Sequence, residues 1–260
     1  MDARLSFYSE TIAQWIPDRG ASVLVVAGGT NDRDVFLENG FTNVVISNID
    51  ERIRGDEFAP YQWSFQDAES LTYPDGSFDY VVTHAALHHC HSPHRGLLEL
   101  YRVARRAVVA FEPSDNFLVR LMQRFGLAQV HEQVAVHCND GKYGGVANTE
   151  IPNYIYRWTE SEVRKTIHSF APVAEHRFRF RYGSDKPDAA MRRKGFVKQA
   201  LISALAPGYA VFTKIFPKQQ NLFAMMIEKP VLPGDLHPWL RMDENQNLRF
   251  NYEWSKERYK

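Results

Sequence analysis

A short unbroken apolar run, Val23–Ala27, most constrains what this chain can fold into. A segment without a single polar side chain is typical of a strand that is buried on both faces of a parallel sheet. Gly28 and Gly29 follow directly. Because glycine has no Cβ, these two residues let the backbone turn sharply and approach a ligand closely. The run therefore predicts the first strand of an α/β sheet with a binding turn at its carboxyl end.

The pattern continues through a compact helix into a second strand. Val35–Leu37 supply the apolar face of the helix, and the pair Asn39-Gly40 predicts its end. Val44–Ile46 form the next apolar run, and Asp50 follows it. The acid lies about 20 residues after the glycines, the spacing at which a strand–turn–helix–strand unit places a carboxylate against ribose hydroxyls.

The charges at the turn restrict the ligand further. A dinucleotide would lay its pyrophosphate on the helix N-terminus, where free N–H groups favour anions. Asp32 and Asp34 stand at that position and would repel it. They suit a ligand that combines ribose and adenine with a cationic centre, as S-adenosylmethionine does. A nicotinamide oxidoreductase, one alternative, needs a phosphate site that this turn lacks.

The rest of the first half alternates between strands and helices. Strands are predicted at residues 63–65, 78–83 and 107–111, and helices at 3–16, from Ser92-Pro93 onward, and at 117–125. This alternation predicts a doubly wound, mostly parallel α/β sheet. Ligands of such sheets collect beyond the carboxyl ends of the strands. The candidate site residues at those ends are Gly28, Gly29, Asp50, Asp67, His84 and Glu112.

The domain organisation follows from the same pattern. Residues 1–228 are predicted to form one α/β domain, with 114–157 as a lid on the acceptor side and 183–220 as a helical insertion. The aromatic residues in 229–260 predict a tail that docks on the domain or on a partner, with a homodimer as one outcome. The basic stretch Met191–Phe196 could rest on a membrane or a lipid-linked substrate, although a packed helix is the favoured interpretation.

Composition excludes several classes of partner. Lysine plus arginine equals aspartate plus glutamate, at 31 each, so no overall field recruits nucleic acid or an anionic membrane. Two cysteines cannot form a disulfide framework, and neither a leader nor an apolar run of membrane-spanning length is present. These features predict a soluble cytoplasmic protein that acts on a small molecule.

Several motifs now point to one family. The chain resembles the class I S-adenosylmethionine-dependent methyltransferases, particularly their small-molecule subgroup. The likeness is most specific at Asp67–Asp79, with an acid before the fourth strand, then a leucine, a proline and Ser-Phe-Asp, and it spans about residues 20–113. Further matching residues in the same order are Leu87-His88-His89, Glu99, Arg102-Val103 and Glu112-Pro113. The resemblance implies a seven-stranded Rossmann-like sheet.

The resemblance also implies roles for individual residues. Ala27–Gly29 would wrap the methionine part of the cofactor, and Asp50 would accept both ribose hydroxyls. Asp67 and the backbone of Ala68 would read the adenine. His84, at the end of the central strand, would sit beside the sulfonium.

The glycine motif departs from the family pattern at Val25, Ala27 and Asn31. This departure keeps two functions open. The first is S-adenosylmethionine-dependent methyl transfer to an oxygen or nitrogen of a small molecule or glycan-type precursor. The alternative is a catalytically silent binding or assembly module that retains the fold.

A histidine-rich segment, residues 84–94, holds six potential metal ligands. Because His84 ends a strand and Ser92 begins a helix, these side chains belong to a loop and not to one helical face with ligand spacing, so we expect no metal. An alcohol or ammonium acceptor needs a proton removed, and an imidazole suits that task. His88 and His89 are the candidate catalytic residues.

Overall fold

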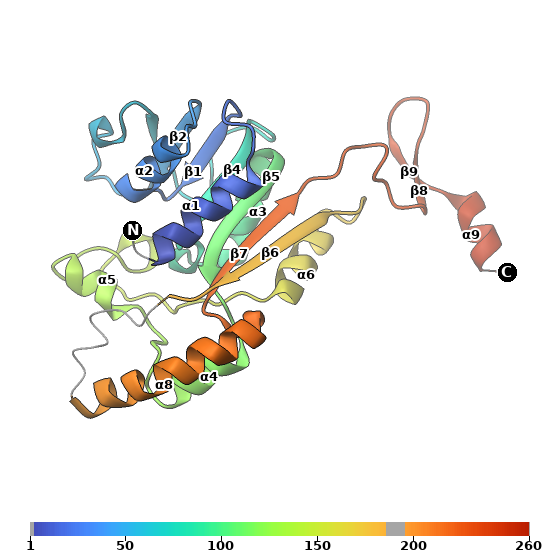
Figure 1. The fold of residues 1–260 in the computed structure, drawn as a ribbon. Coiled ribbons are helices and arrows are strands. Elements are labelled where there is room, and N and C mark those ends of the chain that lie inside the picture. The colour runs from blue at the N-terminus through green and yellow to red at the C-terminus, as the bar shows by residue number, and fades with distance from the viewer. Residues whose placement is uncertain (1–2, 186–195, 260) are drawn as a thin grey trace.

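The computed structural model describes residues 3–185 and 196–259, which build a seven-stranded sheet with helices on both faces (Figure 1). The strand order is β3-β2-β1-β4-β5-β7-β6. The first five strands pair in parallel, whereas β7 is antiparallel to both β5 and β6. The prediction of a doubly wound, mostly parallel sheet is confirmed.

The elements have the following bounds. The strands of the main sheet are β1 (Val23–Val26), β2 (Val44–Asn48), β3 (Gln62–Phe65), β4 (Phe78–His84), β5 (Ala104–Pro113), β6 (Arg177–Gly183) and β7 (Leu222–Glu228). The helices around it are α1 (Ala3–Trp15), α2 (Thr30–Glu38), α3 (Pro93–Val103), α4 (Phe117–Arg124), α5 (Gln133–Cys138), α6 (Glu160–Phe170) and α8 (Phe196–Ile215). A hairpin of β8 (Leu240–Met242) and β9 (Leu248–Phe250) precedes α9 (Tyr252–Arg258).

The sheet is buried on both faces, which explains why β1 has no polar residue. Val25 faces the core layer that contains Tyr8 of α1 and Phe36 of α2. Leu24 points the other way, into the layer that contains Leu97 of α3. Since neighbouring residues of a strand face opposite sides, a strand between two helical layers must be apolar throughout.

Two apolar residues near helix ends lie at the surface, and one of them, Leu37, belongs to a helix face that was predicted to be buried. Leu37 of α2 is 40% exposed, and Phe170 at the end of α6 is 49% exposed. Both stand in the last turn of a short helix, where the chain is already leaving the sheet. Apolar periodicity identified the helices correctly but did not report where each one separates from the core.

A polar network holds the loop that precedes β4. The Glu99 carboxylate accepts the Leu71 N–H at 3.0 Å, and the Arg102 guanidinium donates to the carbonyls of Leu71 and Tyr73, both at 2.8 Å. Arg102 also pairs with Glu99 at 2.8 Å and with Asp75 at 2.9 Å. One guanidinium therefore ties α3 to the loop that carries the most specific part of the family resemblance.

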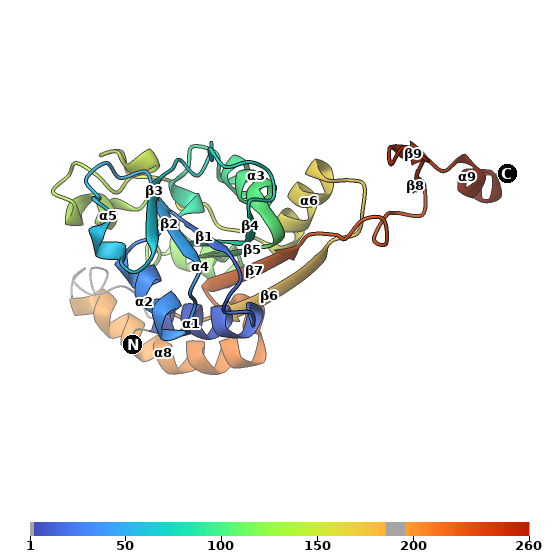
Figure 2. The ribbon, with the colours of Figure 1, turned by 90° about the horizontal axis from the view of Figure 1, so that it is seen from above.

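The C-terminal segment stays attached to the domain only at its start. The Glu175 N–H donates to the Asp235 carbonyl, and the His237 N–H donates to the Val173 carbonyl. Beyond that point β8, β9 and α9 stand away from the sheet in both views (Figures 1 and 2). Docking of the tail on the domain or on a partner stays a prediction.

The basic stretch at Met191–Gly195 lies outside the described residues. Among the helices of the described chain, none has the length and apolar character needed to cross a bilayer.

We expect Arg102→Ala to lower the free energy of unfolding by about 2 kcal/mol, because it leaves two loop carbonyls without their donor and Glu99 without its partner. Urea unfolding at pH 7 measures this. Arg102→Lys keeps the charge but loses the planar fork, so its loss should be intermediate. A change below about 0.5 kcal/mol in the alanine variant would contradict the assigned role.

Candidate active site

The glycine turn after β1 is shaped by close packing beneath it. A Cβ on Gly28 would lie 2.8 Å from Val25 Cγ1 and 2.9 Å from Ile46 Cγ2, so this position accepts only glycine, whereas a Cβ on Gly29 would meet nothing within 4 Å. The Gly29 N–H donates to the Asp32 carboxylate at 2.8 Å. The Asp32 carboxylate thus already accepts the N–H group that a phosphate would need as a donor. This geometry supports a turn that is hostile to anions.

The order of the strands reverses between β1 and β4, which makes their carboxyl ends the switch point of the sheet. Each of these strands is followed directly by an alanine in the left-handed region, Ala27 and Ala85, both with a φ of +55°. This conformation costs a residue with a Cβ about 1 kcal/mol. Strained backbone of this kind collects at functional sites.

Asn48 joins the glycine turn to the candidate ribose acid. Its side-chain amide donates to the Gly28 carbonyl at 3.0 Å, and its side-chain oxygen accepts the Asp50 N–H at 3.0 Å. The Asp50 carboxylate is in turn bound by the Arg52 guanidinium, with Nε 2.9 and 3.0 Å from the two oxygens. This partner lowers the pKa of Asp50, so the carboxylate is ionised at neutral pH. Arg52 also lies over the ring of Tyr143, at 3.9 Å.

The candidate adenine acid lies at the end of the next strand. The Gln66 N–H donates to the Asn48 carbonyl at 3.1 Å, which places Asp67 beside the end of β2. One oxygen of Asp67 accepts the Glu69 N–H at 2.9 Å and caps the turn that contains Ala68. The carboxylate therefore has a structural role in this loop.

His84 ends β4 with its imidazole enclosed. The ring stacks on Tyr8 with centroids 4.4 Å apart, and its Nε2 accepts a hydrogen bond from Arg4 Nε at 3.2 Å. Burial, together with the Arg4 charge, lowers the pKa of His84 to about 3. The ring is neutral at physiological pH and so places no positive charge at the switch point.

A large cavity of about 1190 Å³ opens beyond the ends of β4 and β5. Its walls are mostly apolar and come from the sheet, from α4 and α5, and from α8. Its polar lining includes Arg4, His84, His88, Glu112 and Glu132. Among the described residues that line it, none belongs to the glycine turn or to the two strand-end acids. The cofactor candidates and this cavity therefore lie on different sides of the switch point.

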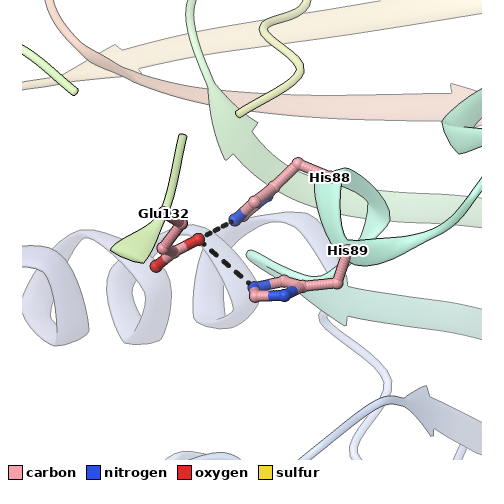
Figure 3. Close-up of side chains that lie close together, drawn as sticks. All are labelled: His88, His89 and Glu132. Carbon is pink, nitrogen blue, oxygen red and sulfur yellow. Dashed lines mark hydrogen bonds and ion pairs between the residues drawn. The ribbon is translucent and has the colours of Figure 1, made fainter. Parts of the chain in front are cut away.

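A histidine–glutamate cluster lies at this cavity and consists of His88, His89, Glu112 and Glu132. All of these except His89 line the cavity, and Figure 3 shows His88, His89 and Glu132. Glu112 is 3% exposed; one of its oxygens accepts the N–H groups of Ala86 and Leu87, and the other lies 2.7 Å from His88 Nδ1. His88 Nε2 lies 3.1 Å from Glu132 Oε2, and His89 Nε2 lies 3.4 Å from the same oxygen.

The ionisable groups of this cluster shift one another's pKa values. Burial alone would lower the pKa of His88, but Glu112 and Glu132 together raise it to about 9. Although burial opposes it, the bond from His88 lowers the pKa of Glu132 to about 2. Burial and the neighbouring His88 lower the pKa of His89.

The other members of the histidine-rich segment point elsewhere. His94 lies 3.2 Å from Glu162 of α6, and His91 is exposed. Sequence reasoning named His88 and His89 but missed Glu132, which lies 44 residues beyond His88 and is the first residue before α5. It also missed Asn48 and Arg52. A lone polar residue in an irregular segment carries no periodic signal.

The buried state of His84 makes a pH-dependent contribution to stability. Its folded pKa of about 3 lies below the ordinary value of 6.5, so between these values the unfolded chain binds the proton and the folded chain does not. The stabilisation is complete above pH 6.5 and is lost as the pH falls toward 3. We expect wild type to lose about 2 kcal/mol more than His84→Gln between pH 7 and pH 5.

Urea unfolding of both proteins at the two pH values measures this difference. The glutamine variant keeps an acceptor for Arg4 but does not titrate, so it is the matched control. Equal losses in the two proteins would show that His84 is not held neutral.

Residues 37–111 match a family model described as a methyltransferase domain. None of the curated proteins compared with the chain matches it in sequence.

Solved structures share the fold at low identity. A putative methyltransferase from Bacillus halodurans has a TM-score of 0.51 at 17% identity, over 86% of this chain and 99% of that one. The cyclase SpnF has a TM-score of 0.53 at 15% identity, over 86% and 81%. Magnesium protoporphyrin IX methyltransferase from Synechocystis, with bound SAH, has a TM-score of 0.50 at 12% identity, over 87% and 82%.

These likenesses show the fold, whose strand order and switch point are described above. The domain match covers β2, β3 and β4 and includes Asp50, Asp67 and His84, but it begins after the glycine turn. The chain therefore has the fold of the class I S-adenosylmethionine-dependent methyltransferases, and its residues 37–111 match a methyltransferase domain, in line with the sequence resemblance.

Proposed function

We propose that the chain transfers the methyl group of S-adenosylmethionine to an oxygen or nitrogen atom of a small molecule or glycan-type precursor. The observation that carries this proposal is the pair of hydrogen bonds made by the Asn48 side chain. This side chain bonds to both the Gly28 carbonyl and the Asp50 N–H, and so keeps the glycine turn and the ribose acid together at one edge of the sheet.

The residues at this edge fit the chemistry of the cofactor. The space above Gly29 is open, and Asp50 is an ionised acceptor suited to two ribose hydroxyls. Asp32 takes up the turn's N–H donor, so an anionic dinucleotide finds no phosphate site. Arg52 must leave Asp50 or share it when ribose binds, because it now spans both carboxylate oxygens.

When bound, S-adenosylmethionine supplies a methyl group that is already activated by positive sulfur. The chain's own task is then to align the acceptor with that methyl and to keep water out. His84, held neutral by burial and Arg4, avoids repulsion of the sulfonium. We infer that the acceptor's proton is handled by His88, which lines the cavity, and by His89, whose ring lies beside it.

The cavity favours an acceptor with a sizeable apolar part. Its volume of about 1190 Å³ exceeds the range of ordinary small-molecule pockets, about 300–1,000 Å³. Apolar side chains of α4 and α8, among them Val119, Leu121 and Phe212, form much of its wall. A polar reacting group would face the histidine–glutamate cluster, while the apolar remainder would lie against these helices.

A cytoplasmic location stays a prediction.

We expect Asp50→Ala to weaken S-adenosylmethionine binding by about tenfold to a hundredfold, because two hydroxyl bonds to a charged group are lost. Isothermal titration calorimetry with S-adenosylmethionine and with S-adenosylhomocysteine measures this. Glu38→Ala is the matched control. Glu38 is an exposed acid at the end of α2 that is farther from the glycine turn, so its loss should leave affinity unchanged.

The alternative, a catalytically silent module, is favoured by the occupation of Asp50 by Arg52. It predicts that the wild-type chain binds neither ligand at millimolar concentration, or binds them without transferring a methyl to any acceptor. Mass spectrometry of a small-molecule extract incubated with the chain and S-adenosylmethionine distinguishes the two. A new product heavier by one methylene, made by wild type and not by Asp50→Ala, supports the enzyme.

A further inference from the structure

We propose that His88, His89 and Glu132 bind a divalent transition-metal ion on the wall of the large cavity. The ligand atoms are the Nε2 atoms of the two imidazoles and a carboxylate oxygen of Glu132. Figure 3 shows the three side chains pointing toward one another, the histidines from the short helical turn Leu87–His89 and the glutamate from the segment before α5.

The spacing of the donor atoms is that of a metal site. Glu132 Oε2 lies 3.1 Å from His88 Nε2 and 3.4 Å from His89 Nε2. Around a zinc ion with bonds of about 2.0–2.2 Å, neighbouring donors stand about 3.0–3.4 Å apart. The candidate ligand atoms all lie within 4.8 Å of one another. The two imidazoles would therefore need to close by no more than about 1.5 Å around an ion.

The second ring nitrogen of each histidine is engaged in the way that metal ligands require. His88 Nδ1 lies 2.7 Å from the Glu112 carboxylate, and His89 Nδ1 lies 3.3 Å from the Gly145 carbonyl. A metal-binding histidine donates its other N–H to a carboxylate or carbonyl, which fixes its tautomer and turns the free nitrogen to the ion. Both rings thus have Nε2 as the nitrogen left for a ligand bond.

An ion-pair clamp without metal is the simpler alternative, and it explains only part of the cluster. A charged His88 between Glu112 and Glu132 is well paired. His89, however, directs its Nε2 at the same Glu132 oxygen, with the two rings 4.6 Å apart. A neutral His89 that donates its Nδ1–H to Gly145 has no proton on Nε2 for that oxygen, whereas one divalent ion is bound by both rings in their neutral form. The nitrogen and oxygen donors suit Zn²⁺ and its neighbours, not Ca²⁺ or Mg²⁺.

The position of the site suggests its use, and this step rests on the proposed function. With three protein ligands, an ion keeps open positions toward the cavity. An acceptor hydroxyl bound there would have a lowered pKa and would release its proton to water. Its oxygen would then form a bond to the methyl carbon, while the electrons of the broken carbon–sulfur bond return to sulfur. The acceptor class that fits is an alcohol or phenol.

The test uses full-length, tag-free protein that has been stripped with a chelator and then titrated with Co²⁺, with Zn²⁺ as competitor. We expect one Co²⁺ per chain, with visible absorption bands that Zn²⁺ abolishes. Glu132→Gln and His89→Ala should each weaken Co²⁺ binding by tenfold or more. Both side chains are partly exposed, so these variants should fold, which near-ultraviolet circular dichroism checks. His137→Ala removes an exposed imidazole from adjacent α5 and should bind like wild type.

The proposal fails if folded wild type shows no saturable Co²⁺ binding at millimolar metal, or if Glu132→Gln and His89→Ala bind as tightly as wild type. S-adenosylmethionine binding is measured separately on the metal-free chain. Metal binding without cofactor binding would remove the proposed function and leave the metal site standing. Cofactor binding and methyl transfer without metal binding would support the proposed function and refute the metal site.

Discussion

The candidate site depends on one buried carboxylate, that of Glu112 at the end of the central strand β5. Glu112 closes β5 and directs one oxygen to two backbone N–H groups of the loop after β4, and the other to the ring of His88. A buried charge is stable only when it is paired and hydrogen-bonded. That requirement joins the ends of β4 and β5, and it orients the ring of His88.

The two halves of the carboxyl edge have different chemistry, and the switch point separates them. On the side of β1, β2 and β3, Asn48 ties the glycine turn to Asp50, and Asp32 occupies the turn's donor. On the side of β4, β5 and β7, an apolar cavity carries a compact polar cluster. In the proposed function, the methyl donor would bind on one side and the acceptor on the other, and the two reacting atoms would meet at the boundary.

The irregular segment between β5 and α6 is ordered by long-range polar contacts. Asn153 is 3% exposed; its side chain donates to the His88 carbonyl, and its carbonyl accepts the Glu132 N–H at 2.9 Å. These bonds place Glu132 against the histidines although little regular structure surrounds it. Because buried backbone groups must find partners, a long loop can be held as firmly as a helix when its polar groups are satisfied by distant residues.

The sequence by itself determined which segments form strands and helices and which residues stand at the strand ends. Apolar runs such as Val23–Val26 and the capping serine before α3 encode local structure, so their elements lie where their patterns predict. The tertiary structure alone decided that Glu132 meets His88 and His89, that Arg52 occupies Asp50, and that burial and Arg4 hold His84 neutral. Periodicity reports which face of an element is buried. It carries no information on which distant polar side chains share a pocket, because those pairs follow from the packing of the whole chain.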